Sequence, residues 1–201
     1  MKTELPFFKV GESFGGQQYW MPEFIMRLGG CAAISACDCA IYLRLYKNFQ
    51  RLSPFDEKNI SREDYINFVE EMKPYLHPRW MGVNTLQLYI DGFEKFLRAR
   101  GEKNLRLSSW FGEYDSESTR LILKYQIDNG YPLPCLMLHH KNPTLKKYEW
   151  HWFLLTGYDF SGEDWRVKVV SYGVERWFDF NLFWDTGFSE KGGLIILETG
   201  D

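Results

Sequence analysis

The sequence lacks any hydrophobic run long enough to cross a bilayer, because no window approaches about 20 consecutive apolar residues. Its first six residues contain no apolar stretch ending in small residues, as a secretory signal would. Lysine and arginine form no long run and the formal net charge is −3, so the basic footprint of a nucleic-acid binder is missing. We therefore expect a cytoplasmic protein that binds neither nucleic acid nor a membrane.

The short motifs that hold common cofactors are also missing. The sequence has no glycine-rich phosphate loop, dinucleotide fingerprint, paired-histidine zinc helix or Cys-x-x-Cys pair. Cysteines are few, and Cys37 and Cys39 stand two apart on an expected helix, where their side chains point to different faces and do not share a metal. We expect free thiols, no metal and no cofactor.

Hydrophobic and aromatic residues are plentiful, at 45% and 18% of the sequence. A chain of 201 residues with this composition can bury a core without disulfides or metals. No repeat, low-complexity tract or linker divides it. We expect a single domain spanning residues 1–201.

The hydrophobic pattern predicts helices in the first half of the chain and strands in the second. Three expected helices cover 31–49, 85–100 and 116–128. A fourth starts at a capping box on Ser61 and stops before Pro74. The expected strands cover 133–139, 150–158, 165–172, 175–180 and 194–198. Their connections are too short for crossover helices, so the sheet should be mainly antiparallel. The predicted fold class is α+β, with helices first and a sheet after them.

Cys31 draws attention because it follows Gly29 and Gly30 at the first turn of an expected helix. The free N–H groups and the dipole of a helix N-terminus favour the thiolate, which is the nucleophilic form of cysteine. A second interpretation is a small core residue, since free cysteine is among the most buried residue types. The cysteine alone does not decide between the two.

His151 stands at the start of an almost wholly apolar expected strand. A base held there could take a proton from a thiol and return it to a leaving group. A lone histidine is more often structural, satisfied by a backbone carbonyl. The combination is more informative, because a cysteine at a helix start with a downstream histidine is typical of a nucleophile and its base.

Three segments carry a family resemblance: QQYW at 17–20, GGCAA at 29–33 and HWFLLTGYD at 151–159. Together they resemble the papain-like cysteine peptidases, nearest the bacterial branch related to bacteriocin-leader-processing, or double-glycine, peptidase domains. The resemblance implies a papain-like fold with the cysteine heading a central helix. It also implies Cys31 as nucleophile and His151 as general base and acid. Gln18, or Gln17 beside it, would share the oxyanion hole with the N–H of Cys31.

The sequence also departs from this family. The family orients its histidine with an Asn or Asp from the next strand, but the corresponding stretch, 169–173, reads VVSYG. Ser171 could accept the second N–H of the histidine, or Asp159 or Asp179 could reach it from elsewhere. The orienting role could also be missing.

Two classes of function follow. The first is a cysteine peptidase or other thiol hydrolase that cleaves an amide bond through a Cys31 acyl-enzyme, or an acyltransferase using the same pair. The second is a papain-like binding or scaffold protein without turnover, whose tryptophans line a ligand groove: Trp20, Trp80, Trp110, Trp150 and Trp152. In the first case the partner is a peptide or another amide-containing substrate. The identity of that substrate and the oligomeric state stay open.

Overall fold

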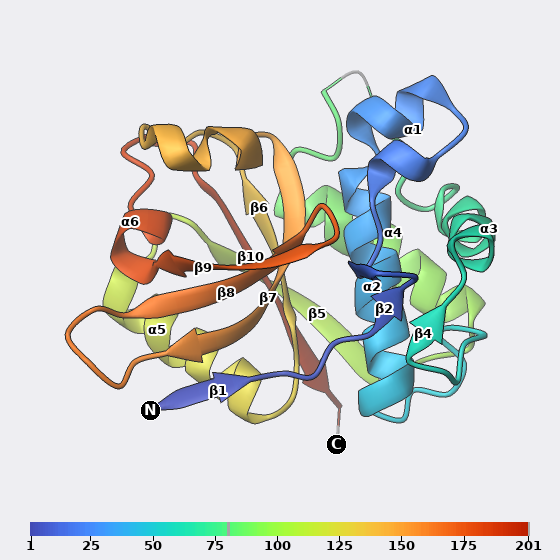
Figure 1. The fold of residues 1–201 in the computed structure, drawn as a ribbon, viewed down its shortest axis with the longest axis horizontal. Helices are drawn as coiled ribbons and strands as arrows, with labels where there is room; N and C mark the ends of the chain where they lie inside the picture. Colours follow the sequence, from blue (N-terminus) through green and yellow to red (C-terminus); the bar gives the residue numbers. More distant parts are fainter. Residues whose placement is uncertain (80, 201) are drawn as a thin grey trace.

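A seven-stranded antiparallel sheet forms the centre of the computed structural model, which describes residues 1–79 and 81–200 (Figure 1). Its strands follow the order β5-β10-β6-β7-β8-β9, and β1 pairs with the end of β7. The bounds are β1 Lys2–Glu4, β5 Leu105–Phe111, β6 Leu133–Met137, β7 His151–Asp159, β8 Arg166–Ser171, β9 Val174–Asp179 and β10 Gly192–Thr199.

Helices cover both faces of this sheet. They are α1 Phe24–Gly29, α2 Cys31–Tyr46, α3 Arg62–Met72, α4 Leu86–Ala99, α5 Ser116–Asp128 and α6 Phe180–Trp184, with short 3₁₀ helices η1 Gln18–Trp20 and η2 Pro143–Tyr148. α2 packs on β6 and β7 and α4 on β5 and β10, whereas α5 packs on β1, β6 and β7. A second, small sheet joins β2 Lys9–Val10, β3 Ser13–Phe14 and β4 Asn59–Ile60.

The α+β class and the antiparallel sheet are confirmed, and so are the four expected helices and five expected strands, within a few residues. The prediction that all helices precede the sheet in the chain is wrong. β5 precedes α5 and pairs with β10, and β1 joins the sheet from the N-terminus. β5 has the two-residue alternation of a half-buried strand, because Leu105 and Leu107 are buried while Arg106 and Ser108 are exposed.

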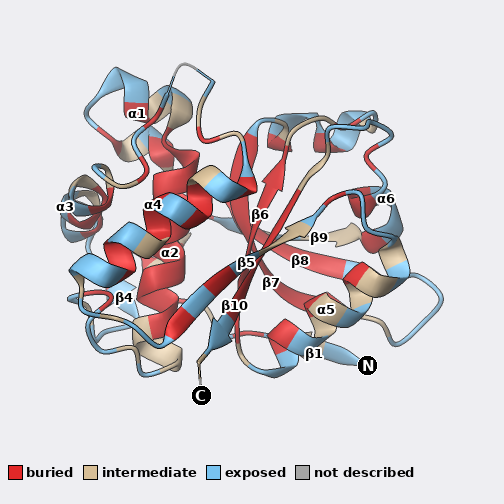
Figure 2. Ribbon diagram, turned by 180° about the vertical axis from the view of Figure 1, so that it is seen from behind, coloured by how far each residue is buried: buried red, intermediate tan, exposed pale blue. Residues whose placement is uncertain are grey.

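α2 is the central helix of the fold. Every residue from Cys31 to Leu43 is buried, and Figure 2 shows the helix red along most of its length. A helix that is apolar all round belongs in a core. Its small residues Ala32, Ala33 and Ala36 let the neighbouring elements approach closely. The first residue of this buried helix is Cys31.

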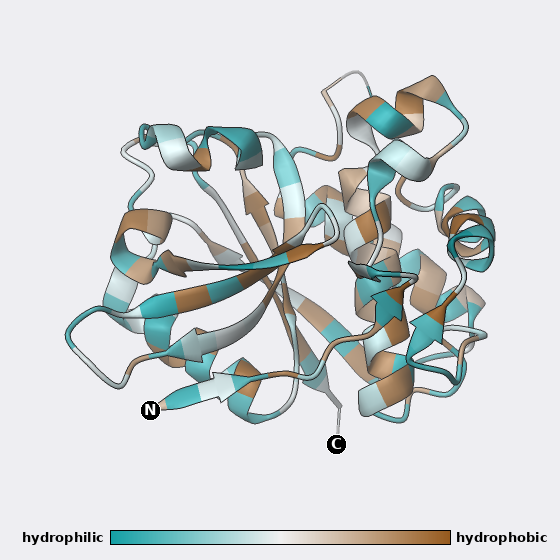
Figure 3. Ribbon diagram, in the orientation of Figure 1, coloured by the Kyte–Doolittle hydropathy of each residue, from teal (hydrophilic) through white to brown (hydrophobic). Residues whose placement is uncertain are grey.

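β7 separates two hydrophobic cores. Trp152 and Leu154 point into the core that contains α2, α3 and α4, whereas Phe153 and Leu155 point into the core under α5 and α6. Figure 3 shows hydrophobic residues along β6 and β8, which pair with β7 along its two edges. A strand buried on both faces is apolar at successive positions, as the expected strand at 150–158 is.

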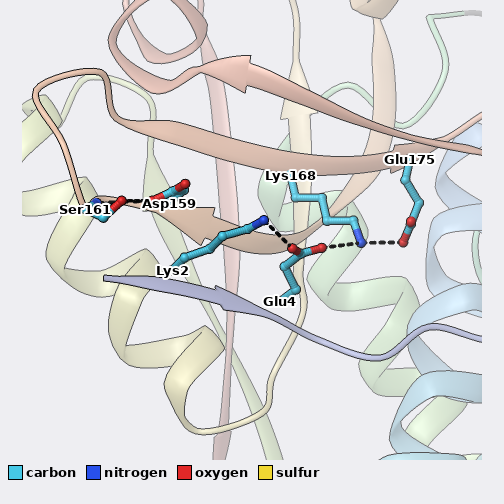
Figure 4. A network of polar contacts seen from close by, with 6 residues as sticks. All are labelled: Lys2, Glu4, Asp159, Ser161, Lys168 and Glu175. Atoms are coloured by element: carbon cyan, nitrogen blue, oxygen red, sulfur yellow. Dashed lines mark hydrogen bonds and ion pairs between the residues drawn. The ribbon is translucent and has the colours of Figure 1, made fainter.

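An ion-pair network fixes β1 to the sheet (Figure 4). The buried Nζ of Lys168 on β8 lies 2.6 Å from Glu175 Oε1 and 3.1 Å from Glu4 Oε2. Glu4 also pairs with Lys2 at 2.8 Å. The N-terminal strand is therefore held by side chains as well as by its ladder with β7. None of the helices within the described residues is long and apolar enough to cross a membrane.

Candidate active site

Cys31 is the first residue of α2, and the chain reaches it directly from α1 through Gly30. The N–H of Gly30 donates to the carbonyl of Met26 at 2.9 Å, and a Cβ on Gly30 would lie 2.5 Å from that oxygen. A side chain there would therefore separate the two helices. The glycine allows α1 to end against the start of α2, which places the Cys31 thiol at a helix N-terminus.

The sulfur of Cys31 lies against the start of β7. Burial raises the pKa of the Cys31 thiol above its ordinary value, and backbone N–H groups of Trp152, Ala32 and Cys31 itself partly offset that rise. β7 pairs with β8 only from Leu154 onwards, so its first three residues extend beyond the paired part of β8. The Cys31 thiol therefore lies between the N-terminus of α2 and the first residues of β7, and β7 begins at His151.

All five residues expected at the site line one cavity. It is bounded by Gln17, Gln18, Cys31, His151 and Ser171, together with Asp38, Tyr172 and neighbouring backbone. The space open to the centre of a water molecule is about 20 Å³, which is room for about one water. In this conformation the site is closed, and Cys31 and His151 are only 7% and 6% exposed.

Ser171 is the partner of the histidine. The Nε2 atom of His151 lies 2.8 Å from the Ser171 hydroxyl oxygen, which comes from the last residue of β8. The two other candidates are used elsewhere: Asp159 accepts hydrogen bonds from Ser161, as Figure 4 shows, and Asp179 caps α6. Burial lowers the pKa of His151 to about 3, so its imidazole is neutral at physiological pH.

Tyr172 covers the ring of His151. Its ring stacks on His151 with centroids 4.4 Å apart and planes within 1°, and Tyr19 stacks on Tyr172 in turn at 5.9 Å. Tyr172 has a φ of +52°, a left-handed conformation that is strained for a bulky residue. The neighbouring Gly173 continues this left-handed turn with a φ of +75°. The turn after Ser171 therefore holds an aromatic ring over the histidine.

The two glutamines take different positions. The side chain of Gln18 is buried, and its Nε2 donates to the carbonyls of Arg27 and Leu28 at 2.9 and 3.4 Å, in the segment that leads to Cys31. Its Oε1 is buried without a partner among the described residues. Gln17 instead donates to Ser13 Oγ at 3.1 Å and packs against Gly173. Gln18 is therefore tied to the approach to the nucleophile, and Gln17 to the turn beyond Ser171.

Sequence reasoning missed Asp38, which lies two helical turns after Cys31 on α2 and lines the same cavity. Its carboxylate accepts hydrogen bonds from the N–H of Gly16 and the hydroxyl of Tyr65, and burial raises its pKa to about 7. A signal was present in the sequence. Asp38 is the one charged residue between positions 31 and 43, which otherwise carry small, apolar or uncharged side chains.

The tryptophans expected to line a groove are divided between core and surface. Trp152 is buried, stacks on Tyr89 at 4.2 Å and donates its indole N–H to the carbonyl of Val83. Trp150 is 42% exposed beside His151 and has a φ of +53°. Trp80 lies outside the described residues.

No group of three or more metal-ligating side chains occurs among the residues that the structure describes. The four cysteines are all free thiols and all buried. In comparisons with known proteins, the chain matches no family model, no curated protein and no solved structure.

Proposed function

We propose that this chain is a thiol-dependent amide hydrolase with a papain-like fold, in which Cys31 is the nucleophile and His151 the general base and acid. One observation carries the proposal. Cys31 from α2, His151 from β7 and Ser171 from β8 converge on one cavity, with the histidine Nε2 on the serine hydroxyl at 2.8 Å. A nucleophile, a base within the same cavity and a group that orients the base form the arrangement that nucleophilic catalysis requires.

The proposal takes Nε2–H of His151 as the donor to the serine oxygen, 2.8 Å away. In that tautomer Nδ1 carries the lone pair and is free to accept the thiol proton. As that proton moves from Sγ to Nδ1, the sulfur forms a bond to the substrate carbonyl carbon and the carbonyl oxygen takes the π electrons. Collapse of this intermediate expels the amine, which takes the proton from Nδ1 and leaves a thioester on Cys31. Water then hydrolyses the thioester through the same base.

Gln18 supports the oxyanion in this proposal, together with the N–H of Cys31. Its 2.9 Å hydrogen bond to the Arg27 carbonyl fixes the amide, while its contact with the Leu28 carbonyl is long, at 3.4 Å. The hydrogen directed at Leu28 is the one that an incoming oxyanion can take. A donor of this kind typically contributes about 3 kcal/mol to the stability of the transition state.

The closed, uncharged state of the site favours a second candidate, a papain-like binding or scaffold protein without turnover. Both members of the pair are buried, the pKa of the thiol is raised and that of the imidazole is lowered to about 3. An ion pair is therefore not the resting state, and the cavity that holds both residues has room for about one water molecule. A protein that only binds ligands would keep this geometry without opening it for reaction.

An activated ester distinguishes the two candidates without knowledge of the natural substrate. We expect p-nitrophenyl acetate to release p-nitrophenolate and to place an acetyl group on Cys31, detected by peptide mass spectrometry. Cys31→Ala should lose this acetylation, and Cys37→Ala, which alters a buried core thiol, should retain it. Acetylation of Cys31 no faster than that of the other cysteines would contradict the enzyme proposal. Capture of the acetyl group by added glycinamide would indicate acyl transfer in place of hydrolysis.

A further inference from the structure

A buried carboxylate lies in the cavity without a role in the reaction above. Asp38 is 5% exposed, and among the described residues no lysine, arginine or histidine lies within ion-pair distance of it. Burying a carboxylate without a cation is costly unless hydrogen bonds satisfy it. The groups that donate hydrogen bonds to Asp38 therefore indicate its role.

Those donors come from the segment that carries the glutamines and from α3. The N–H of Gly16 donates to both carboxylate oxygens, at 3.0 and 3.3 Å, and the hydroxyl of Tyr65 donates to Oδ1 at 2.7 Å. A Cβ on Gly15 would lie 2.4 Å from Asp38 Oδ2, and one on Gly16 would lie 2.0 Å from the Tyr65 ring. The two glycines are needed because the backbone runs directly over the Asp38–Tyr65 pair.

This backbone leads from Asp38 towards the nucleophile. Gly16 is held against the middle of α2, and two residues later the Gln18 amide is bound to the carbonyls of the segment that precedes Cys31. Asp38 and Cys31 are seven residues apart on α2, about 10 Å along the helix axis. We propose that Asp38 is a positioning residue, whose carboxylate anchors residues 15–18 against α2 and so holds the Gln18 amide at the oxyanion position. This inference rests on the function proposed above.

The strength of the Asp38 anchor depends on the charge of its carboxylate. Burial raises the pKa of Asp38 to about 7, although the bonds from Tyr65 and Gly16 oppose that rise. Protonation replaces a charged acceptor by a neutral one, and the hydrogen bond from Gly16 N–H weakens. The titratable groups around Asp38 are Tyr65 from α3, Tyr89 from α4, and Cys37 and Cys39 on its own helix. Those that line the same cavity are Cys31, His151 from β7 and Tyr172.

Two reagents separate an effect on the oxyanion donor from an effect on the thiol. Acetylation of Cys31 by p-nitrophenyl acetate passes through an oxyanion, whereas alkylation by iodoacetamide displaces iodide and forms none. The ratio of the two rates therefore reports the oxyanion donor, and the titration of Cys31 and His151 cancels from it. We expect Asp38→Asn to lower this ratio on the order of tenfold, and Gln18→Ala to lower it at least as far.

The pH dependence of the ratio gives a second readout. In the parent protein the ratio should fall as the pH decreases through about 7, because Asp38 becomes protonated. In Asp38→Asn it should not change over the same range. If Asp38→Asn does not fold, Tyr65→Phe removes the other hydrogen bond to the carboxylate and should shift the transition in the ratio to higher pH.

Asp128 provides the matched control, because it also accepts a tyrosine hydroxyl, from Tyr158 at 2.7 Å, but does not line the cavity. Asp128→Asn should leave the ratio unchanged. A Cys31 that reacts with both reagents but shows the same ratio in Asp38→Asn and the parent protein would overturn this inference alone. An equal loss of both rates would also overturn it. A Cys31 that reacts selectively with neither reagent would overturn the proposed function and this inference with it.

Discussion

The rings of His151 and Tyr172 lie parallel, with centroids 4.4 Å apart and planes within 1°. Tyr172 follows Ser171, the hydrogen-bond partner of the same histidine, so one turn supplies both the group that orients the base and the ring that covers it. Burial is the cause of the low pKa of His151. The Tyr172 ring is one of the groups that bury the imidazole, so it contributes to the low pKa.

Removing the cover should change the titration of the base. We expect Tyr172→Ala to expose the imidazole and to raise its pKa from about 3 towards the ordinary value of 6.5. The measurement is an NMR titration of the His151 ring. Tyr148→Ala serves as the control, because Tyr148 is a buried tyrosine that contacts Tyr172 but does not stack on the histidine. An unchanged His151 pKa in Tyr172→Ala would contradict the role of the cover.

Removing the serine hydroxyl should weaken the base without abolishing it. In Ser171→Ala the imidazole loses its partner at Nε2, and a hydrogen bond of this type contributes roughly 1 kcal/mol, so Cys31 acetylation should slow about two- to tenfold. Ser171→Thr keeps the hydroxyl and should retain most of the rate. Equal rates in Ser171→Ala and the parent protein would show that Ser171 does not orient the base.

The stability of the fold should depend on pH through two opposing groups. His151 has a lowered pKa in the folded state, so its contribution to stability is lost as the pH falls from 6.5 towards about 3. Asp38 has a raised pKa, so its burial costs stability as the pH rises from 3.8 towards about 7. Between about pH 4 and 6.5 the two slopes, each on the order of 1 kcal/mol per pH unit, cancel.

Single variants should reveal each slope. In His151→Ala the free energy of unfolding should decrease with rising pH above about pH 5, because the opposing contribution of His151 is gone and that of Asp38 remains. In Asp38→Asn it should increase with rising pH, because only His151 remains. Urea unfolding between pH 4 and 7 measures both slopes. Parallel curves for the two variants would show that these residues do not titrate as their burial indicates.

The Lys168 network should contribute to stability but not to the site. Lys168→Met leaves the carboxylates of Glu4 and Glu175 without their buried cation, although both remain partly hydrated, so we expect a loss of about 1–3 kcal/mol. The control is Lys124→Met, which breaks an exposed pair with Asp128 and should cost less than Lys168→Met does. Urea unfolding checks both. Equal losses would contradict a special role for the buried lysine.

The sequence predicted the elements whose patterns are local. α5 spans the expected 116–128, and α3 begins after Ser61, whose hydroxyl accepts from the N–H of Asp64. β1 and the place of β5 in the sheet were not predictable in this way. β1 has three residues and is fixed by its pairing with β7 and by the Lys168 network, and β5 is fixed by β10, which comes late in the chain.

The residues of the candidate site also divide into those that the sequence predicted and those that it did not. Cys31 and His151 were predictable because a cysteine at a helix start and a histidine at a strand start are visible in the sequence, and Ser171 followed from the resemblance. Asp38 was missed because its significance lies in contacts with Gly16 and Tyr65, which are distant in sequence. The cover by Tyr172 depends on a left-handed turn, which no pattern of side chains indicates for a tyrosine.

The central claim is that His151 is the base for Cys31, and the rate of Cys31 alkylation by iodoacetamide as a function of pH tests it most directly. With both groups neutral between the pKa of the imidazole, about 3, and that of the buried thiol, the parent protein should show a rate independent of pH from roughly pH 4 to 8. In His151→Ala the rate should fall about tenfold per pH unit below the thiol pKa, because only the free thiolate reacts. The same tenfold decrease in both proteins would show that Cys31 is a buried thiol without a base.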